Sequence, residues 1–313
     1  MIDPAGNKIL IAVDGSDQSL YAVRYVSKMM ASKKTEIVLY HSIRKISEAF
    51  WEMGVKPISS QKLSSIRAWE ISQEKKIHEF LSLSRQIFLD NGFPEESVKI
   101  NIHETRKGIA RDVYNESKSG YTGVVAGRMG LNVLKDLVLG SVAAKLVEKL
   151  HDTPVCLVGG QPRPGKVLLA FDGSEGAMKA VDYTGTMLGN SKSEITLMYV
   201  LRGLNLLQPE DKSLVMKEEK ALFEDAKTGA EPMFNEAKYR LINAGFDPGR
   251  ITTMPVVGVS SRAGAIVQEA KENGYGTIVV GRRGLSKVAE FFLGGVSNKI
   301  IHLAKEMAVW VVS

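Results

Sequence analysis

The chain has 313 residues, of which 44% are hydrophobic and 24% charged, a balance typical of a water-soluble globular protein. Its net charge of +6, from 41 basic and 35 acidic residues, is shared by both halves and forms no basic run, which argues against nucleic acid and membrane surfaces as partners. The single cysteine, Cys156, excludes an internal disulfide framework and any Cys-x-x-Cys site. Because no stretch approaches the roughly 20 apolar residues that span a bilayer, and the first residues do not resemble a signal peptide, we expect a cytoplasmic protein.

In the first half, short β-branched runs alternate with longer amphipathic stretches. Strands are predicted at 8–13, 36–43, 98–103, 122–126 and 154–158. Helical patterns occupy 17–31, roughly 61–91, 107–119 and 141–151. The strands are nearly continuous apolar runs, as expected when helices cover both faces of a parallel sheet. The stretch from 44 to about 60 has weak periodicity and is predicted to have no regular structure.

The second half repeats the first in the same order. Residues 8–16 return 158 positions later as 166–174, and residues 124–131 return 154 positions later as 278–285. Strands are predicted here at 166–171, 194–200, 250–257, 276–280 and 308–312. Residues 159–165 are rich in glycine and proline and are predicted to be a linker. The sequence therefore predicts an α/β protein of two repeated doubly wound domains, 1–158 and 166–313, each with a five-stranded parallel sheet and helices on both faces.

Polar residues just past the first strand of each half are candidate ligand contacts, because open parallel sheets bind ligands beyond the carboxyl ends of their strands. Asp14 and Gly15 occupy this place in the first half, and Asp172 and Gly173 occupy it in the second. Such a carboxylate can accept hydrogen bonds from ribose hydroxyls or an adenine amino group. Alternatively, Asp-Gly-Ser forms the turn and cap of the next helix. The residues leave both interpretations open.

A glycine pattern marks a second candidate. It consists of Gly127 and Gly130 after a strand, with Gly140 and Ser141 opening the next predicted helix. Glycines let the backbone approach a polyphosphate, and the amides and dipole of a helix start favour an anion. The pattern nearly repeats in the second half at Gly281, Gly284, Gly294 and Gly295.

Arginines lie inside both glycine loops. Arg128, Arg282 and Arg283 either neutralise a phosphate or lie in solvent, and the sequence does not decide between these roles. Motifs for P-loop ATPases, dinucleotide-binding proteins, zinc proteases and serine hydrolases are absent. No residue stands out as a catalytic base beside the glycine loop, which favours a binding protein over an enzyme.

An aspartate at the end of the first strand, followed by Gly-x2-Gly-x9-Gly-Ser, resembles the nucleotide-binding pattern of the universal stress proteins. The resemblance covers both halves and implies an adenine nucleotide alpha hydrolase-like fold. It also implies ATP as the ligand, usually with Mg²⁺, with adenine near the first two strands and phosphates in the glycine loop. The family often has His-Val at the end of the second strand. Here Ser42 follows His41 in the first half, and Val200 follows Tyr199 in the second.

The resemblance implies a cytoplasmic ATP-binding regulator or sensor of the stress response. A slow ATP hydrolase and a nucleotide-free dimeric scaffold are the alternatives. Because Ser141 offers a hydroxyl donor and its counterpart is Gly295, we expect the first half to bind ATP more tightly.

The last strands of the halves, 154–158 and 307–312, are apolar and are predicted to lie at sheet edges, which invite a partner strand. The family commonly dimerises through this strand. We therefore expect either an intramolecular pseudo-dimer of the two halves or a homodimer.

Overall fold

The computed structural model describes residues 6–30, 35–43, 60–130, 139–203, 212–284 and 293–313. The first half contains β1 (Asn7–Ala12), α1 (Asp17–Met29), β2 (Thr35–Ile43), α3 (Ser60–Asp90), the 3-10 helix η2 (Glu95–Ser97), β3 (Val98–Glu104), α4 (Ile109–Ser117), β4 (Gly123–Gly127), α5 (Ser141–Lys149) and β5 (Val155–Val158). The second half contains β6 (Lys166–Phe171), α6 (Glu175–Leu188), β7 (Glu194–Arg202), α7 (Lys212–Asn243), the 3-10 helix η3 (Pro248–Arg250), β8 (Ile251–Val259), α8 (Arg262–Glu272), β9 (Thr277–Gly281), α9 (Gly295–Leu303) and β10 (Ala308–Val312).

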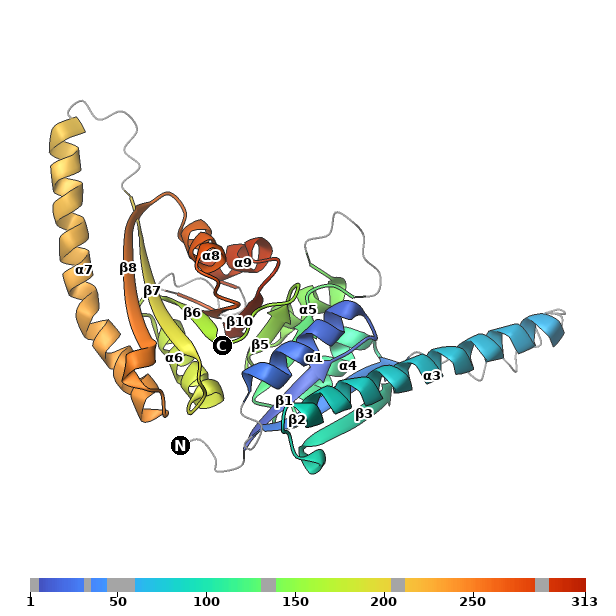
Figure 1. The fold of residues 1–313 in the computed structure, drawn as a ribbon. Coiled ribbons are helices and arrows are strands. Elements are labelled where there is room, and N and C mark those ends of the chain that lie inside the picture. The colour runs from blue at the N-terminus through green and yellow to red at the C-terminus, as the bar shows by residue number, and fades with distance from the viewer. Residues whose placement is uncertain (1–5, 31–34, 44–59, 131–138, 204–211, 285–292) are drawn as a thin grey trace.

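The predicted strands are all present, with ends shifted by at most two residues. The predicted helices of the first half also form, although α1, α4 and α5 are slightly shorter than their sequence patterns. Most of the weakly periodic stretch, 44–59, lies outside the described residues. Figure 1 shows α3 and α7 extending past the strands of their own halves.

The strands form one ten-stranded sheet in the order β3-β2-β1-β4-β5-β10-β9-β6-β7-β8. Neighbouring strands within each half are parallel. The halves join where β10 pairs antiparallel with β5, with Val309 opposite Leu157 and Trp310 opposite Cys156. One sheet therefore runs through both repeats.

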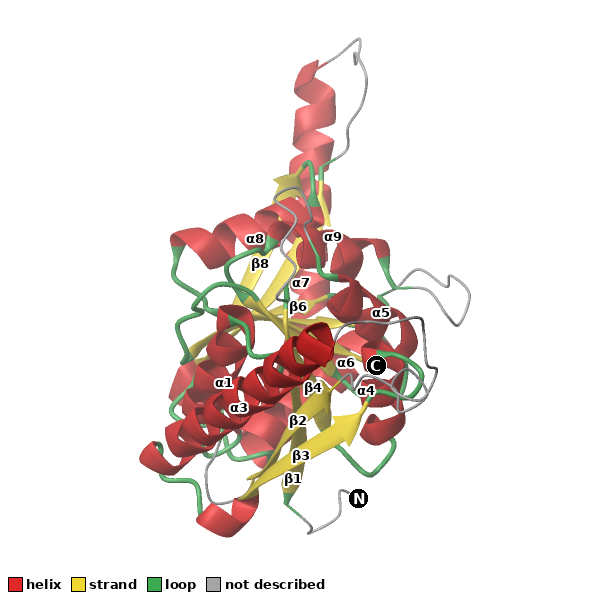
Figure 2. Cartoon of the chain, turned by 90° about the vertical axis from the view of Figure 1, so that its right-hand side faces the viewer, coloured by secondary structure: helices red, strands yellow, loops and turns green. Residues whose placement is uncertain are grey.

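Helices cover both faces of this sheet (Figure 2), which confirms the doubly wound α/β prediction. Successive residues of a strand point to opposite faces. Accordingly, Ile9 and Ile11 belong to a core shared with α1, α3, α6 and α7. Leu10 belongs to the opposite core, which is shared with α4, α5, α8 and α9. In the part of the chain that the structure describes, no helix is long and apolar enough to cross a membrane.

Candidate functional site

A cavity of about 380 Å³ lies in the second half, at the carboxyl ends of β6, β7 and β9. In the sheet, β6 has β9 on one side and β7 on the other, so the chain winds away from β6 in both directions. Doubly wound sheets bind their ligands at this kind of position. The volume lies within the range of small-molecule sites. The cavity is therefore the candidate site.

Two kinds of side chain line the cavity. The apolar wall comes from β6, β7 and neighbouring elements and includes Ala170, Met198, Val200, Val280 and Val296. Four cationic side chains also line it: Arg202, Arg262, Arg283 and Lys299. Among the described lining residues, Asp172 is the one carboxylate. This arrangement suits a ligand that joins an apolar ring to an anionic group.

The start of α9 supplies backbone donors at the cavity. Its N-cap is Gly294, and no side chain caps it. The first bond within the helix runs from the Asn298 amide to the Gly294 carbonyl at 2.9 Å, so the amides of residues 295–297 have no partner within the helix. A Cβ atom at Gly295 would meet nothing within 4 Å, which leaves this end of the helix open to an anion.

Asp172 takes part in the turn that starts α6. Its Oδ1 accepts from the Ser174 amide at 3.1 Å, and the Ser174 hydroxyl accepts from the Ala177 amide at 3.2 Å. Gly173 has a φ of 71°, which glycine adopts without strain. The other oxygen faces Gly284, since a Cβ there would lie 2.4 Å from Oδ2. The same carboxylate thus forms the turn and lines the cavity, so the two interpretations are compatible.

Asp14 has the same geometry in the first half. Its Oδ1 accepts from the amide and hydroxyl of Ser16 at 3.0 and 2.6 Å. A Cβ at Gly130 would lie 2.6 Å from its Oδ2, and Gly15 has a φ of 85°.

The glycines at the ends of β4 and β9, and those before α5 and α9, have structural roles that do not depend on a ligand. A Cβ at Gly127 would lie 3.0 Å from the Gln18 backbone, and one at Gly281 would lie 2.6 Å from the Gly176 backbone. These glycines therefore let β4 and β9 approach the starts of α1 and α6. The amides of Gly140 and Gly294 donate to the carbonyls of Arg128 and Arg282, both at 2.9 Å, and close their loops.

The first half differs at the positions that correspond to the cavity wall. Tyr40 stands where the second half has Met198, and Ser42 stands where it has Val200. The Ser42 hydroxyl bonds to the Thr105 hydroxyl at 2.8 Å and donates to the buried carboxylate of Asp112 at 3.5 Å. Ser141 is the first residue of α5, and its side chain is exposed. The first half therefore has a polar cluster where the second half has an apolar wall.

The structure excludes one of the two roles considered for Arg128 and Arg282, that of a side chain in solvent. Neither guanidinium lies in solvent, since the residues are only 3% and 4% exposed. Arg282 donates to the Leu150 carbonyl at 3.0 Å and the Val147 carbonyl at 2.8 Å, at the end of α5. Arg128 donates to Ile301 and Ala304, at the end of α9. Each arginine is therefore bound to backbone carbonyls of the opposite half, and Arg282 is not among the residues that line the cavity.

Three cavity cations were missed from the sequence: Arg202, Arg262 and Lys299. Arg202 ends β7 and Arg262 begins the helix after β8, so the rule of inspecting strand ends applies to both. Lys299 lies inside α9 and carries no such signal. Ser297 lines the cavity, but its hydroxyl donates to the Gly281 carbonyl at 2.7 Å. In the described residues, no three His, Cys, Asp or Glu side chains gather to hold a metal ion.

The chain is a tandem α/β protein: two repeated doubly wound domains share one sheet, and a cavity lies at a switch point of strand order. The sequence model of the Universal stress protein family matches residues 6–158 and 164–313. The chain therefore belongs to the universal stress protein family, and membership places it among stress-response proteins.

Similar proteins cover either one half or the whole chain. A universal stress protein of Mycolicibacterium smegmatis is 22% identical over 304 residues, which cover 95% of this chain and 94% of the relative. Universal stress protein YxiE of Bacillus subtilis is 28% identical over 142 residues, which cover 44% of this chain and 93% of the relative. The crystal structure of a universal stress protein from Archaeoglobus fulgidus has the same fold, with a TM-score of 0.60 at 18% identity. That match covers 98% of this chain and 96% of the other.

Proposed function

We propose that the protein is a cytoplasmic stress-response regulator that binds ATP in the cavity of its second half. The observation that carries this proposal is the pairing, in one cavity, of an apolar wall with an open helix start. Adenine packs against Ala170, Met198 and Val200. The phosphates lie at the start of α9, near Arg283 and Lys299, where amides and cations favour an anion.

The proposal places the stronger site in the second half, which reverses the expectation from Ser141. Two of the cavity cations have uncharged counterparts in the first half. Arg262 is the first residue of α8, and Ile109 is the first residue of α4. Arg283 precedes Gly284, and Met129 precedes Gly130. The buried Asp112 carboxylate of the first half adds negative charge close to Ser42, which disfavours an anionic ligand.

Binding is proposed without hydrolysis. A hydrolase needs a base that activates water beside the phosphates. Asp172 is the one carboxylate among the described lining residues, and its Oδ1 is used by the Ser174 amide. Mg²⁺ would be held mainly by the phosphates of the nucleotide and by water, as is usual for this ion.

The two halves are proposed to act as an intramolecular pseudo-dimer. Since β5 and β10 pair with each other within the chain, neither is available to a second chain in the same way. This supports pairing of the halves over a homodimer through these strands.

Calorimetric titration of the full chain with MgATP tests the proposal through a matched pair of variants. Gly295→Val places a branched side chain in the open space at the start of α9, and Ser141→Val makes the equivalent change in α5. We expect Gly295→Val to lower ATP affinity at least tenfold, because the side chain occupies the phosphate position, and Ser141→Val to leave it unchanged. Absence of ATP binding by the unmodified chain would exclude the function. The reverse pattern would place the site in the first half, and release of ADP would identify a hydrolase.

A further inference from the structure

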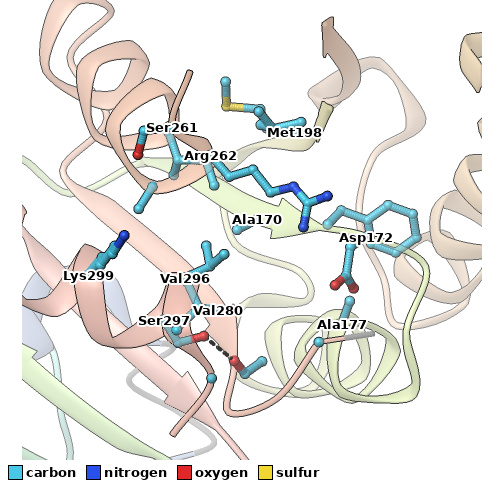
Figure 3. A pocket seen from close by; sticks show the side chains of 18 of the residues that line it. Ala170, Asp172, Ala177, Met198, Ser261, Arg262, Val280, Val296, Ser297 and Lys299 are labelled. Carbon is cyan, nitrogen blue, oxygen red and sulfur yellow. Dashed lines mark hydrogen bonds between the residues drawn. The ribbon is translucent and has the colours of Figure 1, made fainter. Parts of the chain in front are cut away.

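Arg262 occupies an unusual place in the cavity. It is the first residue of α8, whose N-cap Ser261 accepts a hydrogen bond from the Gly264 amide at 3.2 Å. From there its side chain reaches across the cavity toward Asp172 (Figure 3). Within the described part of the chain, the guanidinium has no hydrogen-bond or ion-pair partner, and the residue is exposed. A charged planar group therefore lies over the cavity, and no described residue is bonded to it there.

The position of this guanidinium separates it from the cations at the phosphate end. Arg283 belongs to the glycine loop and Lys299 to α9, so both come from the elements around the open helix start. Arg262 comes from α8, which follows β8 on the other side of the cavity, and it extends over the wall that contains Ala170 and Met198. An apolar ring system is the part of a ligand that this wall accepts.

A guanidinium is suited to cover such a ring. It is planar and weakly hydrated, and it stacks on aromatic faces. A cation within about 6 Å of a ring centroid is attracted to the ring's electron-rich face. Lysine lacks this planar shape, and isoleucine lacks the charge as well.

Building on the proposed function, we propose that Arg262 is a base-binding residue whose guanidinium stacks on the nucleotide base. The base lies between the guanidinium and the apolar wall of β6 and β7. Ile109, the corresponding first residue of α4, cannot make this contact, which limits tight base binding to the second half.

Two variants of the full chain, Arg262→Ile and Arg262→Lys, test this inference with three probes: MgATP, adenosine and inorganic tripolyphosphate. Arg262→Ile introduces the residue that the first half has. We expect it to weaken ATP and adenosine by the same factor, about 2- to 30-fold, because both carry the base. Tripolyphosphate affinity is expected to stay unchanged. Arg262→Lys should recover only part of this loss for ATP and adenosine, because the charge remains while the planar group that stacks on the base is lost.

The other outcomes overturn the inference. If Arg262→Ile weakens ATP and tripolyphosphate but not adenosine, and Arg262→Lys restores binding, the side chain contacts phosphate. If ATP binds both variants as tightly as the unmodified chain, Arg262 contacts no part of the ligand while the proposed function stands. If the unmodified chain binds neither ATP nor adenosine, the proposed function fails, and the inference fails with it. Urea unfolding midpoints equal to that of the unmodified chain show that the variants fold.

Discussion

Arg128 and Arg282 make the same contact in opposite directions across the junction of the two halves. Arg282 follows β9 and donates to carbonyls at the end of α5, including Leu150, while Arg128 follows β4 and donates to carbonyls at the end of α9, including Ala304. Burial lowers the pKa of both guanidinium groups. A helix C-terminus carries partial negative charge and free carbonyls, so a buried cation is stabilised there. The glycine loop of the second half is thus bound to α5 of the first half, and the glycine loop of the first half is bound to α9 of the second.

Replacing Arg282 by methionine should destabilise the protein. The variant keeps much of the apolar stem but leaves the carbonyls of Val147 and Leu150 without their donor. Hydrogen bonds to charged groups contribute about 1.5–3 kcal/mol, so the free energy of unfolding should fall by about that amount. Urea denaturation measures it. Arg262→Ile, at an exposed arginine, is the control and should change stability by no more than about 0.5 kcal/mol. A similarly small loss for Arg282→Met would contradict the role of the contact.

Tyr25 and Tyr183 form a matched pair at the same junction. The Tyr25 hydroxyl accepts from Trp310 Nε1 at 3.0 Å and lies 2.9 Å from the Thr277 hydroxyl, so it links α1 to β9 and β10 of the other half. The Tyr183 hydroxyl is buried and has no hydrogen-bond partner in the described residues. Tyr25→Phe should lower the free energy of unfolding by about 1–3 kcal/mol, because buried partners are left unsatisfied. Tyr183→Phe should be neutral or stabilising.

Thermal and urea unfolding of Tyr25→Phe and Tyr183→Phe measure the change in the free energy of unfolding that each substitution causes. Equal effects of the two substitutions would mean that the hydrogen bonds of Tyr25 contribute no net stability, and that only the change in packing is measured.

The strands were predictable because each is a short apolar run, and this pattern can be read from the run itself without knowing its partners in the fold. Ile9 and Leu10, for example, are fully buried on opposite faces. The roles of Arg128 and Arg282 were not predictable in this way, because their partners lie in the other half of the sequence and become neighbours only when β5 pairs with β10. Ser42 shows the same limit, since its partner Asp112 lies 70 positions away. Local patterns gave the positions of the candidate glycines, whereas the partners of Arg128, Arg282 and Ser42 are distant in the sequence and were not predicted.

Acidification should destabilise the protein through His41. Burial lowers the pKa of this imidazole, whose Nδ1 lies 2.8 Å from the Val13 carbonyl. The unfolded chain takes up a proton as the pH falls through about 6.5, while the folded chain does so only at lower pH. The unfolded state then binds more protons, so the stability that His41 contributes above pH 6.5 is lost progressively below it.

Urea unfolding at pH 7.5, 6.5 and 5.5 measures this effect in the unmodified chain and in His41→Asn, which keeps a side-chain amide near the Val13 carbonyl. The asparagine variant should lose less stability between pH 7.5 and 5.5. The remaining loss should include a part from His151, since burial lowers its pKa as well. Identical pH profiles of the two proteins would show that the pKa of His41 is the same in the folded and unfolded states.

Gly295→Ser should raise the affinity of the second half for ATP, if the nucleotide binds as proposed. The substitution gives α9 the hydroxyl that Ser141 provides at the start of α5. The space is open, and the nearby Ser297 hydroxyl is already used by the Gly281 carbonyl, so it cannot supply the same donor. A hydrogen bond to a charged group contributes about 1.5–3 kcal/mol, which corresponds to about ten- to a hundredfold tighter binding. Gly295→Ala is the control, because it adds the Cβ atom without the hydroxyl and should leave ATP affinity unchanged in calorimetry. Equal gains for both variants would assign the effect to a stiffer helix start, and no gain for serine would place the phosphates away from residue 295.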